Sequence, residues 1–219
     1  MSLSSGVNNM KIGIIGAGVV GRAMAKLAVK AGHDVMLSNS RGPKSMFSLP
    51  HATGCALGTV EEAAHFGDMV VLAIPLYAYD ALPSSLLAGK LVVDACNYYP
   101  ERDGRIPELD QQKQTSSGLI ALHFAQSHIV KAFNAIPMNE LESDGLPAGR
   151  PERRALPVAG DRESDKISVA ALYEQFGFDV VDAGALSEGA RFERGTPAYC
   201  KPLNREALTA ALAAASVPK

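Results

Sequence analysis

A glycine-rich stretch near the start of the chain constrains the fold more than any other feature. Residues 13–21, GIIGAGVVG, place Gly16, Gly18 and Gly21 in a G-x-G-x-x-G pattern. A short apolar run precedes the pattern and an amphipathic segment, residues 22–32, follows it, so the order is strand, tight turn and helix. The stretch therefore predicts a dinucleotide-binding turn. A glycine-rich turn that only packs a helix against a strand is the alternative.

Each glycine has a physical role in such a turn. Gly16 allows a sharp reversal, Gly18 lets the backbone approach a pyrophosphate, and Gly21 lets the helix pack closely on the strand. The phosphates then lie against unpaired N–H groups at the positive end of the helix. The residues expected to bind the cofactor here are Gly16, Ala17, Gly18, Val19, Val20 and Gly21.

The residues after the expected second strand, 33–37, favour NADP over NAD. An NAD-binding protein carries Asp or Glu at this point for the ribose 2′-hydroxyl, whereas this chain has Ser38, Asn39, Ser40 and Arg41. No carboxylate repels a phosphate, and the guanidinium of Arg41 can pair with one or stack on adenine. The alternative is an ordinary polar turn that leads into Gly42 and Pro43.

Composition sets the class of protein. The 219 residues are 47% hydrophobic with a formal charge of −2, which predicts a soluble chain with a full core and no nucleic-acid or membrane partner. No apolar run reaches the roughly 20 residues of a membrane span, and no signal peptide is recognisable. Three widely spaced cysteines favour neither a disulfide framework nor a metal site and fit a reducing cytoplasm.

Strand and helix patterns alternate along the chain. Thr59 and Glu62 form a candidate capping box, and a short helix between residues 42 and 54 is expected to break around Pro50. The fold class that this predicts is α/β, a Rossmann-type doubly wound parallel sheet with a small C-terminal αβ appendage. We expect a flexible tail at 1–10, an NADP-binding domain at 11–137, and an appendage at 138–219 that completes the acceptor site. Strands are expected at 12–15, 33–37, 54–57, 69–74, 91–95, 129–133, 155–159 and 178–181, and the main helices at 22–32, 59–66, 114–127 and 162–176, with an alanine-rich helix at the end.

Several of these strands end at the same edge of the expected sheet, where ligands bind in doubly wound folds. Ile74 and Pro75 follow one strand, Asn97 another, and Asn134 to Pro137 a third. We expect the ribose and nicotinamide to lie against Ile74, Pro75 and Ala135, with Asn97 or Asn134 near the carboxamide. Simple strand-terminating turns are the alternative.

The residues also resemble a known family. GIIGAGVVGRAMA, SNSR, MVVLAIP, IVKAFNAIP, VAGD and VVDAGALSEGARFE look like the NADPH-dependent coenzyme F(420) reductases, from Lys11 to about Glu193. The resemblance implies a homodimer that transfers hydride between NADPH and a deazaflavin, with NADP held by 16–21, 38–41, 74–75 and 135–137. It also implies that Asp182, Ala183, Gly184 and Leu186 lie near the second cofactor. After Glu193 the chain departs from the family, with Pro197 and Pro202 where members continue as a long apolar helix.

Hydride transfer between two cofactors requires positioning rather than a protein nucleophile, and we name no catalytic side chain. The five histidines are expected in surface turns and helices, Lys131 at a strand edge, and Asp94 in a structural hydrogen bond, with proton transfer as its less favoured role. Four aromatic residues are candidates for the wall of the acceptor pocket, although they also suit the core: Tyr98, Tyr99, Phe192 and Tyr199.

The sequence thus predicts an NADP(H)-dependent oxidoreductase whose small-molecule co-substrate is coenzyme F(420), a flavin or a small oxidised molecule. A non-enzymatic NADP-sensing module and a reductase of a small imine or carbonyl compound are the alternatives. Hydroxyacid and pyrroline-carboxylate reductases append a large helical domain, for which the chain after the sixth strand is too short. A homodimer is expected, joined partly through the apolar side of the last helix, which carries Leu203, Ala207, Leu208, Ala211 and Leu212.

Overall fold

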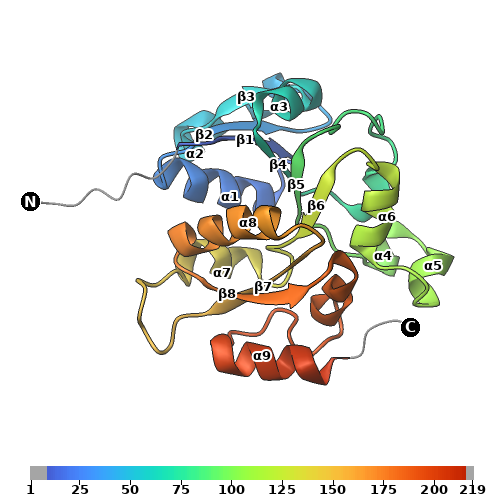
Figure 1. Cartoon of the computed structure of the whole chain (residues 1–219). Helices are drawn as coiled ribbons and strands as arrows, with labels where there is room; N and C mark the ends of the chain where they lie inside the picture. Colours follow the sequence, from blue (N-terminus) through green and yellow to red (C-terminus); the bar gives the residue numbers. More distant parts are fainter. Residues whose placement is uncertain (1–8, 216–219) are drawn as a thin grey trace, which may run out of the picture.

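The computed structural model describes residues 9–215 and contains one sheet of eight strands in the order β3-β2-β1-β4-β5-β6-β7-β8 (Figure 1). Strands β1 to β6 are mutually parallel, β7 pairs with β6 in the antiparallel sense, and β8 is parallel to β7. The chain order reverses between β1 and β4, which is the topological switch point of a doubly wound fold. The strands are β1 (Lys11–Ile15), β2 (Asp34–Ser38), β3 (Ala56–Gly58), β4 (Met69–Leu72), β5 (Leu91–Asp94), β6 (His128–Lys131), β7 (Ala155–Gly160) and β8 (Asp179–Gly184).

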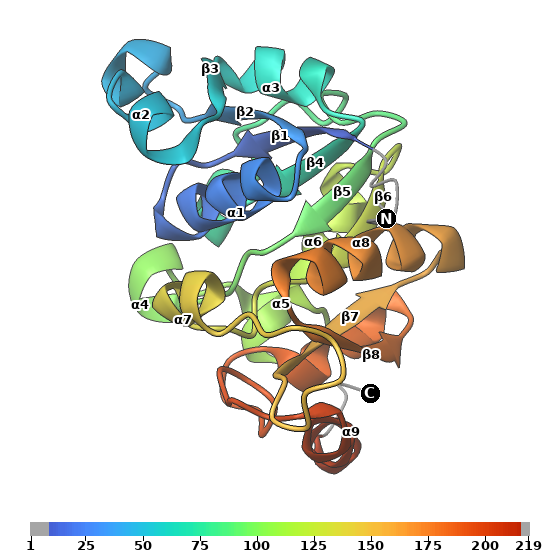
Figure 2. The same cartoon turned by 90° about the vertical axis from the view of Figure 1, so that its left-hand side faces the viewer.

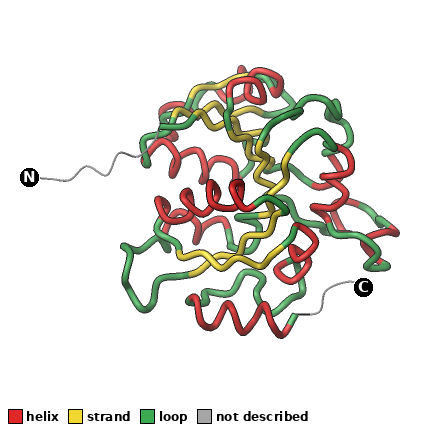
Figure 3. The backbone as a smooth tube through the Cα atoms, viewed as in Figure 1, coloured by secondary structure: helices red, strands yellow, loops and turns green. Residues whose placement is uncertain are grey.

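Helices connect most of these strands (Figure 3). The α-helices are α1 (Val19–Lys30), α2 (Leu49–Thr53), α3 (Val60–Phe66), α4 (Pro100–Asp103), α5 (Pro107–Asp110), α6 (Ser116–His123), α7 (Met138–Ser143), α8 (Glu163–Phe176) and α9 (Arg205–Ala214). Three 3₁₀ helices complete the described part of the chain: η1 (Pro43–Met46), η2 (Leu76–Ala78) and η3 (Leu186–Phe192).

The sheet separates two layers of helices. Helices α1, α7 and α8 cover one face, where Met24, Leu141 and Tyr173 belong to the largest core cluster. Helices α3 and α6 cover the other face, where Ala64 and Ile120 belong to a second cluster. In the turned view of Figure 2, α1 and α8 lie on the same side of the strands and α9 lies beyond β8. Burial on both faces explains why the central strands are continuous apolar runs.

Most of the expected elements are present, and the differences have local reasons. The helix expected between residues 42 and 54 is interrupted before Leu49 rather than at Pro50. Proline is tolerated in the first turn of a helix, and Pro50 occupies that turn of α2. The Thr59–Glu62 capping box is confirmed, with both reciprocal hydrogen bonds formed. The parallel α/β class is confirmed for β1 to β6.

The C-terminal strands extend this sheet rather than forming a separate one. Val130 pairs with Gly160 and Lys131 with Ala159, so β7 starts beyond the carboxyl end of β6 and runs back toward it. The reversal places η3, which follows β8, next to β6 and α6. The division of the chain at residue 137 stays a prediction.

Helix α9 packs against this extension of the sheet. Leu208 and Leu212 are buried in a third cluster with Phe192 and alanines of β7 and β8, and Leu203 and Ala211 pack against the same cluster. The apolar side of α9 is therefore covered within the chain, contrary to the expectation that it is available for a second copy. Ala207 is exposed.

Two further expectations concern the N-terminal tail and membrane-spanning segments. The tail predicted at 1–10 lies mostly outside the described residues, which begin at Asn9. Within residues 9–215, no helix combines the length and the hydropathy needed to cross a bilayer.

Candidate functional site

The glycine turn connects β1 to α1, and two of its glycines make contacts that exclude a side chain. Gly16 has a φ of +115°, and a Cβ there would lie 2.2 Å from the carbonyl oxygen of Ala73, at the end of β4. A Cβ on Gly21 would lie 1.8 Å from the carbonyl oxygen of Gly16. Both positions therefore require glycine for the turn itself.

Gly18 differs from these two glycines. It adopts extended backbone with φ −69°, and a Cβ there would meet no atom within 4 Å. The space in front of Gly18 is open, which is the arrangement that a bound pyrophosphate requires. The fold does not need glycine at this position, which fits the role in pyrophosphate binding that the sequence predicts for it.

The N-terminus of α1 can bind an anion. Gly18 is its N-cap and provides no side-chain cap, and no acidic residue lies in the first turn. Among the described residues, the amides of Ala17, Val19 and Val20 have no backbone acceptor. Val19 is 47% exposed although it is apolar. Unpaired N–H groups and the helix dipole both favour a phosphate here, so the turn fits the dinucleotide that the sequence predicts.

The four polar residues at and after the end of β2 have separate roles. Ser38 is fully buried and its hydroxyl donates to the carbonyl of Ile14 at 3.0 Å, so this side chain is part of the sheet and not of the phosphate site. The carboxamide oxygen of Asn39 accepts from the backbone N–H of Arg41 at 3.0 Å and shapes the loop. Ser40 and Arg41 are exposed, and no hydrogen bond or ion pair of the Arg41 guanidinium occurs within the described residues. Of the four, Ser40 and Arg41 are therefore placed to meet a ligand.

The carboxyl ends of β4, β5 and β6 lie beside this turn in strand order. A Cβ on Gly16 would lie 3.1 Å from Cγ2 of Ile74, which places the Ile74–Pro75 segment against the glycine turn. Pro75 is the N-cap of η2 and Pro137 the N-cap of α7. Neither proline ends its strand as expected, because β4 already ends at Leu72 and β6 at Lys131. Ala135 and Ile136 are buried, at 2% and 5% exposed, and each belongs to a core cluster.

The two asparagines at these strand ends are bonded to each other. Asn97 donates from Nδ2 to the carbonyl of Asn134 at 3.0 Å, and Asn134 donates from Nδ2 to Oδ1 of Asn97 at 3.2 Å and to the carbonyl of Phe192 at 3.1 Å. Oδ1 of Asn134 is buried and has no partner among the described residues. The pair joins the ends of β5 and β6 and holds η3 against them.

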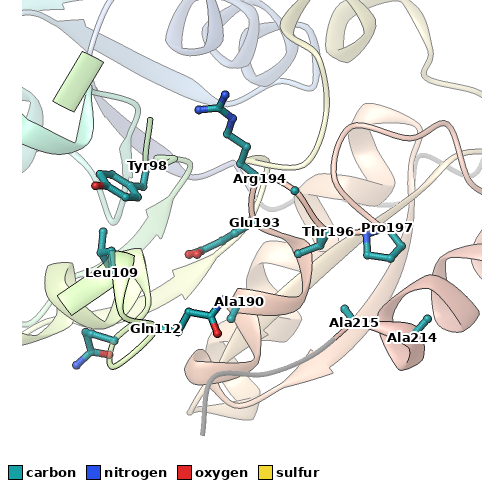
Figure 4. Close-up of a pocket in the computed structure, with 12 residues that line it drawn as sticks. Tyr98, Leu109, Gln112, Ala190, Glu193, Arg194, Thr196, Pro197, Ala214 and Ala215 are labelled. Carbon is teal, nitrogen blue, oxygen red and sulfur yellow. The ribbon is translucent and has the colours of Figure 1, made fainter. Parts of the chain in front are cut away.

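Tyr98 and Glu193 lie among the residues that line a cavity of about 460 Å³ (Figure 4). Tyr98 follows Asn97 in the sequence, and Glu193 follows Phe192, whose carbonyl accepts from Asn134, so the cavity begins one residue after Asn97 and one residue after Phe192. Its walls come from the segment after β5, from α5 and the loop between α5 and α6, from η3 and the segment after it, and from the end of α9: Tyr98, Leu109, Gln112, Gln114, Ala190, Glu193, Arg194, Gly195, Thr196, Pro197, Ala214 and Ala215.

A buried lysine lies under this cavity. Lys131 is fully buried, and its Nζ lies 3.3 Å from Oε1 of Glu193, 3.5 Å from Oδ2 of Asp94 and 2.9 Å from Oγ of Ser116. Burial lowers the pKa of Lys131, but the carboxylates of Asp94 and Glu193 outweigh burial and raise it above its ordinary value, so the ammonium is retained. The expectation of a strand-edge lysine is therefore wrong. Asp94 has the structural role that we favoured, since it accepts from the Cys96 amide at 2.9 Å.

The aromatic residues expected to wall the acceptor pocket have different positions. Tyr98 lines the cavity. The hydroxyls of Tyr99 and Tyr199 lie 2.5 Å apart, and the guanidinium carbons of Arg102 and Arg194 lie 4.8 and 5.1 Å from the Tyr99 ring centre. Phe192 is fully buried in the core and is not part of the wall.

The segment that the family resemblance places near the second cofactor does not line the cavity. Asp182 lies 2.5 Å from the ammonium of Lys166 on α8, and Leu186 packs in the core on the α6 side of the sheet. Two histidines also differ from expectation: His33 is 5% exposed and bonds Gln175 at 2.6 Å, and His128 is the first residue of β6.

Sequence reasoning missed Glu193 and its pairing with Lys131. One signal was present in the chain. LVVD and HIVK each carry one charged residue at the fourth position of an otherwise apolar strand, and Asp94 and Lys131 are register partners in the sheet. Charges of opposite sign at matching positions of adjacent buried strands predict a pair. Glu193 has no such signal, since it comes from a segment 62 positions away from Lys131 in a non-helical connection.

A doubly wound sheet with an open glycine turn at its switch point defines a Rossmann-type dinucleotide-binding protein. Residues 11–98 match the family model described as NADP oxidoreductase, coenzyme F(420)-dependent. The chain is therefore an NADP-dependent oxidoreductase, and its residues 11–98 match the F(420)-dependent family that the sequence resembles. No curated protein matches the chain.

Solved structures agree with this assignment. A hypothetical protein from Sinorhizobium meliloti is 28% identical, with a TM-score of 0.78 over 90% of this chain and 96% of the other. A protein from an Arthrobacter species, named provisionally as an F(420)-dependent NADP reductase, is 26% identical, with a TM-score of 0.71 over 83% of this chain and 87% of the other. An imine reductase from a Pseudomonas species shares the fold, at 15% identity and a TM-score of 0.59, over 94% of this chain and 61% of the other.

Proposed function

We propose that this protein transfers a hydride between NADPH and a planar redox co-substrate, a deazaflavin such as coenzyme F(420) or a flavin. The observation that carries the proposal is the 460 Å³ cavity lined by Tyr98, which follows β5 at the same carboxyl edge of the sheet as the glycine turn that follows β1. The provisional name of the Arthrobacter relative supports the same co-substrate.

In this proposal the chain positions two ligands. Bound NADPH supplies the hydride. The amides of Ala17, Val19 and Val20 and the guanidinium of Arg41 bind its phosphates, and the segments at residues 74–75 and 135–137 hold the nicotinamide end. The Asn97–Asn134 pair fixes the distance between this crevice and the cavity. The protein contributes orientation and exclusion of water, and the reaction needs no protein nucleophile.

A panel of acceptors tests the proposal. Purified protein is mixed with NADPH under anaerobic conditions, and nicotinamide oxidation is followed with a deazaflavin, FMN, a quinone and a cyclic imine in separate reactions. We expect turnover with the deazaflavin or FMN. Turnover with the imine alone assigns the protein to imine reduction, and tight NADPH binding without turnover on any acceptor assigns it to NADP sensing. Each of these two results overturns the proposal.

Homodimerisation, a cytoplasmic location and the cofactor-binding roles of individual residues stay predictions. The proposed dimer needs a surface other than the one containing Leu208 and Leu212, since α9 buries both within the chain.

A further inference from the structure

The carboxylate of Glu193 lines the cavity, and its contacts with Ser116 and Lys131 fix its position. Oε1 of Glu193 accepts from the backbone N–H of Ser116 at 3.2 Å and from its hydroxyl at 2.5 Å, and lies 3.3 Å from Nζ of Lys131. Ser116 is the first residue of α6, so the positive end of that helix also favours the negative charge. The side chain of Glu193 is 23% exposed, and its other oxygen, Oε2, has no partner within residues 9–215.

The side chain of Gln114, which lines the same cavity, is also held by a backbone amide. The amide oxygen of Gln114 accepts from the backbone N–H of Thr115 at 3.0 Å, one residue before the amide that holds Glu193. The NH₂ group of Gln114 has no acceptor among the described residues, and Gln114 lines the same cavity. The cavity therefore offers a charged acceptor and a neutral donor that are anchored on consecutive amides at the start of α6.

The charge of this part of the cavity is negative. Two carboxylates, Asp94 and Glu193, share the single ammonium of Lys131. Arg194 also lines the cavity, but its guanidinium lies 2.7 Å from Glu101 and stacks on Tyr99. An uncompensated, partly desolvated carboxylate oxygen favours an N–H donor and opposes an anion.

We infer that Glu193 is a specificity residue that accepts the ring N–H of a pyrimidinedione, with Gln114 donating to the carbonyl beside it. Flavins and deazaflavins share this edge, in which N3–H lies between two carbonyl groups. The inference rests on the proposed function and names the part of the co-substrate that the cavity recognises. Hydride transfer occurs elsewhere on the ring system, so Glu193 orients the co-substrate and takes no part in the bond changes.

The test compares ligands with and without this N–H. 5-Deazariboflavin and its N3-methyl derivative are titrated into protein saturated with NADP⁺, and binding is measured by quenching of ligand fluorescence, which needs no turnover. A hydrogen bond to a charged group corresponds to about a 10- to 100-fold change in affinity, so N3-methylation is expected to weaken binding to the wild-type protein by that factor.

Glu193→Gln is the matching variant. This substitution retains the size of the side chain and replaces the charged acceptor. It is therefore expected to weaken the binding of 5-deazariboflavin by a similar factor, and to remove the difference in affinity between 5-deazariboflavin and its N3-methyl derivative. Glu163→Gln is the control, because Glu163 also pairs with a lysine, Lys166, but on the surface of α8. It is expected to bind both ligands as the wild type does, and NADPH affinity is expected to be unchanged in both variants.

Two results overturn the inference. The first is equal binding of the two ligands by the wild-type protein, which needs no variant to fold. The second is a ligand difference that persists in Glu193→Gln. NADPH oxidation by 5-deazariboflavin in the same preparations separates this failure from that of the proposed function: turnover with equal binding overturns the N–H recognition alone, whereas absence of both binding and turnover overturns both.

Discussion

At the scale of single residues, the three glycines of the turn are glycine for different reasons. Gly16 and Gly21 are required by contacts within the chain, whereas Gly18 faces open space. Substitution to alanine therefore separates a role in folding from a role in binding.

Gly18→Ala is expected to reduce stability by no more than about 1 kcal/mol, since alanine tolerates the extended backbone and is only a poorer N-cap. Its added methyl occupies the space proposed for the pyrophosphate, so NADPH affinity is expected to fall at least about tenfold. Gly21→Ala is the contrasting variant, with a stability loss of about 1–3 kcal/mol or more from the clash with Gly16. Urea unfolding and NADPH fluorescence titration measure the two effects. Wild-type NADPH affinity in Gly18→Ala would contradict the placement of the phosphates.

Arg41 is the residue expected to distinguish NADP from NAD. Arg41→Ala removes a charge-assisted contact with the 2′-phosphate, so NADPH affinity is expected to fall about 10- to 100-fold while NADH affinity changes little. Lys44→Ala, in the same exposed loop, is the control and is expected to leave the NADPH-to-NADH ratio unchanged. Dissociation constants for NADPH and NADH are the measurement. Equal losses of affinity for the two cofactors would contradict the proposed contact between Arg41 and the 2′-phosphate.

At the scale of elements, α9 shows how an amphipathic pattern can be misassigned. The pattern correctly predicts a helix with one apolar face, but it does not say which surface covers that face. Here β7, β8 and Phe192 cover it, because the antiparallel return of β7 leaves the end of the sheet without another helix on that side.

Leu208→Ala is expected to lower the free energy of unfolding by about 2–5 kcal/mol, since Leu208 is 1% exposed and its truncation leaves a cavity in the core. Glu206→Gln, on the exposed side of α9, is expected to change stability by less than about 0.5 kcal/mol. Urea denaturation at two protein concentrations measures both. If Leu208→Ala instead changed only the oligomeric state, the apolar face would have to be an interface between copies.

At the scale of the whole molecule, Lys131 connects parts of the chain that are far apart in sequence. Its ammonium joins β5 through Asp94, α6 through Ser116 and the C-terminal segment through Glu193. Removing the ammonium leaves two carboxylates without their shared partner. Buried charge without a partner lowers the free energy of unfolding.

Lys131→Met is expected to destabilise the protein by about 3–5 kcal/mol at neutral pH. Because the carboxylates raise the pKa of Lys131 above 10.5, the contribution of the ammonium is complete below a pH of about 10.5 and is lost only as the pH rises through the higher folded value. The difference in urea stability from the wild type is therefore expected to be constant from neutral to moderately alkaline pH. Lys166→Met, which removes a lysine from two exposed carboxylates, is the control and is expected to cost about 1 kcal/mol or less. A loss for Lys131→Met as small as that of the control would show that the cluster is solvated.

Much of the fold follows from local patterns. The alternation of apolar strands with amphipathic helices predicts β1 to β6, and the glycine spacing predicts the turn and its position at the switch point. These features depend on residues that are neighbours in sequence or that repeat with a fixed period, so one chain is enough to read them. The position of Arg41 after β2 follows for the same reason.

The roles of some polar residues could not be read in this way. Ser38 begins the polar stretch that follows the apolar run, yet its hydroxyl bonds within the sheet, because β2 continues one residue further than the apolar run. Glu193 reaches Lys131 because β7 reverses direction beside β6 and carries η3 with it.

The sequence by itself determined a doubly wound NADP-binding sheet, because its apolar periods and glycine positions act over a few residues at a time. Only the tertiary structure decided that a buried ammonium holds Glu193 at the cavity and that α9 packs onto its own chain. Both depend on the direction in which distant segments return to the sheet, and no local pattern encodes that direction.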